Sequence, residues 1–364
     1  MGSDPKARCL SIHASYRCKS AGACCTAGWA IPVEIPVYDV LRRHYPADDR
    51  LFVTGGRMPD GAAAMLALRA NGGCVFFERE RGRLCRVHRE LGPASLPMAC
   101  RQFPRVALHD ARGVLISLSH YCPTAAGLLI DPPPLTIVAA PSPLALSGDV
   151  EGLDARDALP PLLTPEMLTD IEGYDAWERR AIAMLARDID PGTALHAIAR
   201  TTQRIQSWRP GCGSLAAEVH RQFDVASISE HEEDEGADGA RVTAVLASVP
   251  AGLTAPEAYP DVAAGWRRLH LPPEVQRVLR AYLAARLFGN WIAYYGRGLH
   301  VVVEYLRAAH ALVKMEAVRR HALTAAASTA SAVSPWEIAT EAIRSADLLL
   351  VHLSDPKTLA RALG

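Results

Sequence analysis

Cysteine placement is the feature that most limits how this chain can fold. Eight of its nine cysteines lie within the first 122 of 364 residues, at positions 9, 18, 24, 25, 74, 85, 100 and 122. The opening residues, "MGSDPKARCLSIHASYRCKS", contain no apolar signal segment, so we expect the protein in the cytoplasm. Disulfides do not persist in that reducing compartment. Clustered thiols there indicate metal ligands or redox groups.

The neighbouring pair Cys24 and Cys25 favours metal over a disulfide. A ring closed between adjacent cysteines is strained, whereas one metal or cluster accepts neighbouring thiolates. Seven cysteines spread over about 105 residues are therefore candidate ligands. They are Cys18, Cys24, Cys25, Cys74, Cys85, Cys100 and Cys122. Cys212 stands alone, and we interpret it as a small buried hydrophobe.

Composition narrows the classes of partner. Apolar residues make up 49% of the chain, which is enough to bury a sizeable core. Lys plus Arg and Asp plus Glu are equal at 39 each, so no overall basic field favours nucleic acid or anionic lipid. No stretch runs to about 18 apolar residues, as a membrane helix requires. We expect neither nucleic acid nor membrane as a partner.

The pattern of local signals predicts a mainly α protein with a small, irregular, loop-rich β part. Residues 1–130 are predicted to form a cysteine-cluster metal domain packed on a helical domain, residues 161–364. Between them, residues 131–160 are rich in proline and small side chains, "DPPPLTIVAAPSPLALSGDVEG" included, and predict an extended connector.

Within the first domain, "DGAAAMLALRANGG" predicts a helix over 61–70 that stops at the glycines. Residues 74–87 predict a short hairpin, and the alternating Val114, Ile116 and Leu118 predict a strand.

The second domain is predicted to be helical. A first helix is expected to begin with Thr164 as its N-cap, and a second to end before Pro210. Residues 229–240, "SEHEEDEGADGA", predict a solvated acidic loop. Apolar residues recur at helical spacing from Val275 and again from Leu299, and "SPWE" from Ser334 has the pattern of a capping box.

Four blocks of the sequence resemble a known family when they are taken in order. They are "CKSAGACCTAGW", "CVFFERERGRLCRVHRELG", "LPMACRQFPRV" and "LISLSHYCPTAAGLL". They are similar to the cysteine motifs of the flagellin lysine-N-methylases (FliB type), within the wider YkgJ-like group of zinc- or iron-chelating domains. The helical C-terminal part also looks similar, including Arg344 and His352.

The resemblance implies thiolates that hold a 4Fe–4S cluster or, as the alternative, zinc. It also implies methyl transfer from S-adenosylmethionine to lysine side chains of a flagellin-like protein substrate. Thiolate ligands suit either metal centre, and zinc would need four thiolates or three with a histidine such as His88. Family members usually carry another cysteine between the first one and the pair. Residues 19–23 here are "KSAGA", so that ligand is missing, and Cys9 is a candidate replacement.

Catalytic groups are not singled out by spacing. The chain has neither a glycine-rich Rossmann loop nor a CxxxCxxC motif. A base that deprotonates lysine could be Glu34, Tyr121 or Glu304. Helical histidines, His300, His310 and His352, are interpreted as structural because no Glu-x-x-His pair accompanies them. Two other functions remain open: a non-enzymatic metal-binding or redox-sensing module with a helical partner-binding half, and a maturation factor with the same chemistry and another target.

Overall fold

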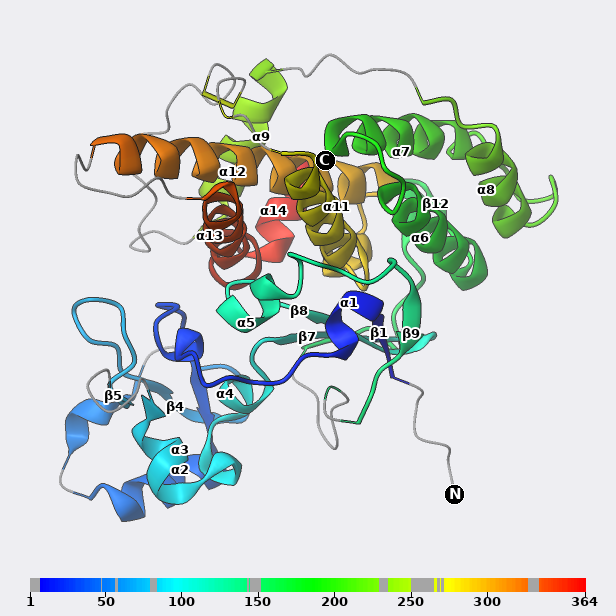
Figure 1. Cartoon of the computed structure of the whole chain (residues 1–364). Coiled ribbons are helices and arrows are strands. Elements are labelled where there is room, and N and C mark those ends of the chain that lie inside the picture. Colours follow the sequence, from blue (N-terminus) through cyan, green and yellow to red (C-terminus); the bar gives the residue numbers. More distant parts are fainter. Residues whose placement is uncertain are drawn as a thin grey trace.

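The computed structural model describes residues 7–46, 48–55, 58–78, 84–142, 144, 152–228, 235–249, 265–266, 269, 272–326 and 334–364. About 54% of the chain is helix and 13% is strand, so the protein is mainly α with small sheets. Figure 1 shows the helices gathered above a central sheet, with the cysteine-bearing loops below it.

The strands are short. Their bounds are β1 Arg8–Leu10, β2 Pro32–Glu34, β3 Phe52–Val53, β4 Ala62–Leu66, β5 Phe77–Glu78, β6 Leu84–Cys85, β7 Arg105–Asp110, β8 Gly113–Leu118, β9 Ile137–Ala139, β10 Gly152–Asp154, β11 Leu162–Thr164 and β12 Met167–Leu168.

The longest helices lie after residue 170. Their bounds are α1 Ser11–Ala14, α2 Ile35–His44, α3 Arg86–Leu91, α4 Met98–Gln102, α5 Pro123–Gly127, α6 Ile171–Leu185, α7 Pro191–Ile205, α8 Leu215–Asp224, α9 Glu235–Ala247, α11 Pro273–Leu287, α12 Leu299–Ala326, α13 Pro335–Asp347 and α14 Pro356–Leu363. Shorter turns are η1 Ala23–Cys25, η2 Asp49–Leu51, η3 Pro93–Ser95, η4 Trp291–Tyr295 and the π-helical turn η5 Leu348–Leu353.

A five-stranded mixed sheet occupies the middle of the molecule, in the order β10-β7-β8-β1-β9. The hairpin β7–β8 is antiparallel, β1 runs parallel to β8, and β9 runs antiparallel to β1. The predicted strand around Val114 is confirmed as β8, whose side chains from Val114 to Leu118 are all buried. Burial on both faces explains why this strand is almost continuously apolar.

The segment predicted as a connector contributes both edges of this sheet. Strand β9 pairs with β1, and β10 pairs with β7. Gly152 begins β10 so close to β7 that an added Cβ would lie 2.3 Å from the Ala107 carbonyl oxygen. Only glycine permits that approach.

The described residues between 16 and 104 form a small unit that we call the cysteine lobe. A three-stranded sheet, β2-β4-β3, packs on α2, and the two-stranded β5–β6 lies beside it. The hairpin predicted over 74–87 is confirmed in this pair, although its turn lies outside the described residues. The helix predicted over 61–70 is wrong. Residues 62–66 form β4, because pairing with strands on both sides outweighs the helix propensity of alanine and leucine.

The helical half, α6 to α14, holds the larger core. Helix α12 is buried without interruption from Ala308 to Val318 and packs against α7, α9, α11 and α13. Helix α7 confirms the second predicted helix, and Ser334 forms the predicted capping box with Glu337. Two details were wrong. Thr164 ends strand β11, and α6 begins later with Asp170 as its N-cap.

The predicted acidic loop is replaced in part by helix. Residues 229–234 lie outside the described part of the chain, but α9 begins at Glu235. Within it, Asp238 pairs with Arg241 and with the buried Lys314 of α12. Asp238 therefore pairs with cations of the same chain. The composition of the segment does not reveal these ion pairs.

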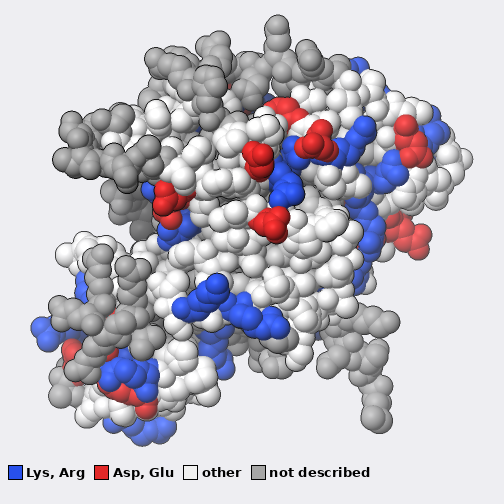
Figure 2. Space-filling view, viewed as in Figure 1, with Lys and Arg blue, Asp and Glu red and all other residues white. Residues whose placement is uncertain are grey.

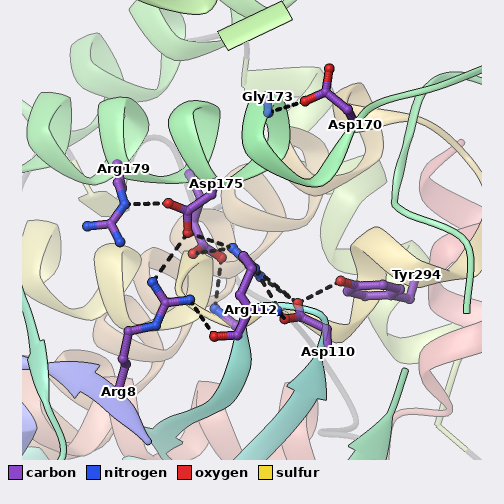
Figure 3. Close-up of polar contacts among 10 residues, drawn as sticks. Arg8, Asp110, Arg112, Asp170, Gly173, Asp175, Arg179 and Tyr294 are labelled. Atoms are coloured by element: carbon purple, nitrogen blue, oxygen red, sulfur yellow. Dashed lines mark hydrogen bonds and ion pairs between the residues drawn. The ribbon is translucent and has the colours of Figure 1, made fainter. Parts of the chain in front are cut away.

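A buried ionic cluster joins the sheet to α6 (Figure 3). Arg112, in the β7–β8 turn, contacts the Asp110 carboxylate at 2.8 Å and Glu178 of α6 at 2.9 Å. Tyr294 donates a hydrogen bond of 2.6 Å to Asp110 from the other side. Because the cluster is buried and its charges are paired, it joins the central sheet to α6 in one defined arrangement.

Charged side chains on the face seen in Figure 2 mix both signs over the helices, and a short row of basic residues crosses the middle. Among the described residues, no helix is both long and apolar enough to cross a bilayer.

Candidate metal centre

All seven predicted ligands line one cavity of about 430 Å³ in the cysteine lobe. The residues come from five separate places in the chain. They are Cys18, Cys24 and Cys25 of the first loop and η1, Cys74 before β5, Cys85 at the end of β6, Cys100 of α4, and Cys122 before α5. The fold therefore brings together thiols that are up to 104 positions apart, as the sequence predicted.

Four of these cysteines form an inner group. The Sγ atoms of Cys24 and Cys25 lie 4.0 Å apart, and the Cys25 thiol also hydrogen-bonds Cys74 and Cys85. Backbone contacts fix the group, since the Cys74 amide donates to the Cys25 carbonyl at 2.9 Å.

The loop geometry that presents the pair depends on glycine and tryptophan. Gly22 begins η1 with a φ of 75°, a left-handed conformation that side-chain-bearing residues seldom adopt. The Trp29 indole then donates a hydrogen bond of 3.1 Å to the Cys24 carbonyl oxygen. Together these contacts hold both thiols toward the cavity.

Hydrogen bonding favours thiolates at three of the four inner positions. The Cys25 thiol and the backbone amides of His88 and Val87 lower the pKa of Cys85 to about 7. The pKa values of Cys24 and Cys74 are also lowered, in each case chiefly by the Cys25 thiol. The pKa of Cys25 itself is raised, chiefly by the hydrogen bond with Cys24, and its single hydrogen can be donated to only one of these neighbours at a time. Because thiolates rather than thiols bind metals, this is the chemistry that a metal centre requires.

Two more of the seven cysteines, Cys18 and Cys122, lie near Tyr16. The Tyr16 hydroxyl lies 3.9 Å from Cys122 Sγ, and the Ser20 amide donates to Cys18 Sγ at 3.4 Å. Burial, followed by the charges of Cys122 and Cys18, raises the pKa of Tyr16. Cys100 is partly buried and packs against the core of the lobe.

The donor set fits a thiolate-bound centre, but the spacing is not that of an assembled single-ion site. Within the described part of the chain, no three or more His, Cys, Asp or Glu side chains are arranged to hold a metal ion. The inner thiols instead contact each other through hydrogen bonds.

Three other residues complete the list of candidates considered in the sequence. Cys9 is fully buried in β1 and does not line the cavity, and burial raises its pKa to about 11. Cys212 is exposed, so its interpretation as a buried hydrophobe is wrong. His88 is exposed and lines the cavity next to Cys85.

None of the three candidate bases lines the cavity. Glu34 accepts a hydrogen bond of 2.9 Å from the Met98 amide, and Tyr121 hydrogen-bonds Thr26. Glu304 pairs with Arg241 and Arg307 on the helical half. Each of these side chains has a structural contact that explains its position.

Sequence reasoning missed a buried polar network where the sheet meets the helices. Asp347 accepts hydrogen bonds from Tyr282 at 3.0 Å and from the His120 amide, and pairs with Arg286 at 3.3 Å. His13 contacts His120 through their Nε2 atoms at 3.2 Å. Arg280 and Arg286 within the apolar α11 were the only sequence signal, because charged residues are rarely placed on a buried helix without partners.

Comparison of the chain with protein-family models, with curated proteins and with solved structures found no match.

Proposed function

We propose that the seven-cysteine cavity holds a thiolate-bound metal centre, a 4Fe–4S cluster with zinc as the alternative. The observation that carries the proposal is the convergence of all seven thiols on one cavity. Cysteines that are only small hydrophobes have no reason to gather from five parts of the chain. The inner four, Cys24, Cys25, Cys74 and Cys85, are the proposed ligands, and Cys18 and Cys122 are candidates for a second site or for redox chemistry.

The residues around the cavity have separate tasks in this proposal. The amides of Val87 and His88 stabilise the Cys85 thiolate, and Trp29 orients Cys24 through its carbonyl. When bound, an iron–sulfur centre would supply thiolate-ligated iron for electron transfer or Lewis-acid chemistry. The same centre would tie together the short elements of the lobe, which we propose to be a metal domain packed on the helical half.

For the whole protein we propose S-adenosylmethionine-dependent methylation of lysine side chains on a flagellin-like protein, in the cytoplasm. Support comes from the four cysteine-containing blocks, which occur in the order of the flagellin lysine-N-methylases. The motif residues Arg101, Pro104 and Arg105 lie beside the cysteine cavity, where Arg101 and Arg105 line its wall.

Metal analysis of anaerobically purified protein tests the centre. We expect brown protein with bound iron and acid-labile sulfide, and loss of both in Cys74→Ser. Cys212→Ser is the matched control because this thiol is exposed and far along the chain from the others. Stoichiometric zinc without iron would show that the centre is a zinc site and not a 4Fe–4S cluster. Protein that binds neither metal would refute the proposal.

Mass spectrometry tests the methyl transfer. A flagellin co-expressed with the wild-type protein should gain 14 Da increments on lysine, the mass of a methyl group replacing hydrogen (about 14 Da). Cys74→Ser should abolish them and Cys212→Ser should not. If flagellin stays unmodified when it is co-expressed with metal-loaded wild-type protein, flagellin is rejected as the substrate. The proposal of a metal centre is not affected by that result.

A redox-sensing module is the second candidate, favoured by the contact of Cys25 with the non-adjacent Cys85, whose pKa is lowered to about 7. In metal-free protein, hydrogen peroxide would oxidise two thiols to one disulfide and be reduced to two waters. Counting free thiols before and after peroxide treatment, in metal-loaded and metal-free protein, distinguishes the redox sensor from the metal centre. Reversible loss of two thiols from the metal-free protein as purified would favour the sensor.

A further inference from the structure

A second cavity, of about 260 Å³, is lined by both the cysteine lobe and the helical half. Trp29 and Phe103 line it from the lobe, and Trp291 and His352 line it from the helices. Its volume exceeds the roughly 150 Å³ of an engineered apolar cavity that accepts benzene. The cavity is therefore large enough for a flat molecule bigger than benzene.

Several polar side chains of the wall are already satisfied by the fold. Asn290 donates to the Arg286 carbonyl oxygen at 2.7 Å and accepts from the Ile292 amide at 2.8 Å. The Arg286 guanidinium pairs with Asp347 at 3.3 Å and hydrogen-bonds Tyr305. Because these groups have partners within the protein, they do not select a ligand.

His352 is different, because one of its two ring nitrogens is still available. Its Nε2 lies 2.7 Å from Ser119 Oγ. Among the described residues Nδ1 has no hydrogen-bond partner, and it is not one of the unpartnered atoms that are enclosed by protein. The ring is only partly buried, and it lines this cavity rather than the cysteine cavity. A ligand in the cavity can therefore reach Nδ1.

The buried network determines which nitrogen of His352 carries the hydrogen. Asp347 is the carboxylate partner of Arg286, and Ser119 hydrogen-bonds the same carboxyl group. An ionised carboxylate only accepts, and a hydroxyl has one hydrogen to give. Ser119 therefore donates to Asp347 and accepts the hydrogen of His352 Nε2. Burial lowers the pKa of His352 to about 3, so the imidazole is neutral at pH 7 and Nδ1 carries a lone pair.

Neighbouring rings hold the imidazole in place. The centroid of His352 lies 4.7 Å from that of Trp29 and 5.6 Å from that of Phe103, and the latter two are 5.7 Å apart. Together with the hydrogen bond to Ser119, these contacts keep the ring from turning. Aromatic side chains of this kind pack well against another flat ring.

The turn η5 is the backbone feature that brings His352 to the cavity. It is a π-helical turn that follows α13, and its residues Leu350 and Val351 also line the wall. Such turns are rare and occur frequently at functional sites. This turn places the available nitrogen on the cavity side of the helical half.

The charges around the cavity favour a neutral ligand. No Asp or Glu is among its described lining residues, so an ammonium group would have no counter-charge there. The charge of Arg286 is already balanced by Asp347. The lone pair of His352 Nδ1 accepts a hydrogen bond, so a matching ligand needs an N–H or O–H donor.

We propose that this cavity binds a neutral, flat aromatic molecule whose N–H or O–H group donates a hydrogen bond to His352 Nδ1. The rings of Trp29 and Phe103 hold the body of the ligand, and the lone pair selects the donor. The proposal concerns a ligand site beyond the metal centre and needs neither metal nor methyl transfer to be correct.

Isothermal titration calorimetry with indole tests the site on the anaerobically purified full chain. Benzofuran is the matched control, because it has nearly the same shape with an oxygen in place of the N–H group. We expect saturable binding of indole at millimolar concentration or below, and about fivefold weaker binding of benzofuran, the effect of one ordinary hydrogen bond. No saturable binding of indole, or benzofuran affinity equal to or above that of indole, overturns the proposal.

Two variants locate the contact. His352→Phe keeps a ring but removes the acceptor, so indole should bind about fivefold more weakly and benzofuran should not change. His321→Phe makes the same substitution at an exposed position of α12 and should change neither affinity. Unchanged indole affinity in His352→Phe refutes the assigned contact.

Ser119→Ala tests how the imidazole is set. Without Ser119, nothing directs the hydrogen of His352 to Nε2, so the preference for indole over benzofuran should decrease while the cavity keeps its shape. If His352→Phe does not fold by circular dichroism, Ser119→Ala decides alone. An unchanged preference in Ser119→Ala then refutes the proposal.

Discussion

The cysteine lobe and the helical half achieve a folded state by different means. In the helical half, α12 is buried without interruption from Ala308 to Val318, and one continuous apolar core extends from α6 to α14. The lobe is built from strands of two to five residues and short helices around a much smaller cluster. Small cores contribute little net stability, and natural domains of this kind commonly add a metal or disulfides. This difference indicates that the thiols contribute to the folded structure of the lobe as much as its apolar residues do.

Removal of the proposed metal should separate the two regions most strongly. Metal binding to small domains contributes on the order of 10 kcal/mol to their folding. We expect chelated protein to lose hydrogen-exchange protection at the amides of β4 and α3, while α12 keeps its protection. Equal protection in the lobe before and after chelation would mean that its core is sufficient without metal.

Removing Arg112 from the buried ionic cluster should have the next largest effect on stability. Arg112→Met leaves the buried carboxylates of Asp110 and Glu178 without their cation, which should cost about 3–5 kcal/mol in the free energy of unfolding. Urea denaturation measures it. Arg156→Met, which removes an exposed pair with Asp154, is the control and should leave the midpoint unchanged. Similar midpoints for both variants would contradict a structural role of the cluster.

Acid should weaken the contact between the sheet and the helical half. Burial lowers the pKa of both His13 and His352 to about 3, from an ordinary value of 6.5. Below pH 6.5 the unfolded chain therefore binds more protons than the folded one, so stability is complete above that pH and falls as pH decreases toward 3. Urea denaturation should show a loss of about 2 kcal/mol between pH 6.5 and 5.5 for these two residues together, and His120, whose pKa burial also lowers well below 6.5, should add to that loss.

A variant without one of these histidines checks that assignment. His352→Phe should have a smaller loss of stability over the same pH interval, because one of these buried sites no longer takes up a proton on unfolding. An identical pH dependence would assign the effect to other groups.

The smallest effect compares equal deletions in the two cores. Ile31 of the lobe and Ile198 of α7 are both almost fully buried, at 1% and 0% exposure. Substitution by valine removes one methylene from each and should cost about 0.5–1.5 kcal/mol. We expect the lower value for Ile31→Val, because the short elements of the lobe can relax around the gap. A larger cost for Ile31→Val in denaturant titrations would show that the lobe is the more rigidly packed region.

Local patterns were sufficient where one segment decides its own structure. The capping box at Ser334 depends on residues three apart, and the apolar run at Val114 to Leu118 already indicates a buried strand. The same reasoning failed at 61–70, where pairing with β2 and β3 decides the outcome. The sequence predicted that the seven cysteines meet, but not which four form the inner group.

The buried network was beyond prediction for a related reason. Asp347 meets the His120 amide across 227 positions, and Tyr282 across 65. No spacing rule connects residues so far apart, and each of them is unremarkable in its own segment.

The edge strands β9 and β10 have a consequence for how the protein is made. Because β9 covers the free edge of β1 and β10 covers that of β7, the central sheet closes only after residue 154 has been synthesised. Until then the nascent chain presents two unpaired edges, which are templates for aggregation. A truncation at residue 130 would make that transient state permanent, so the shortest fragment suited to independent expression extends through β10.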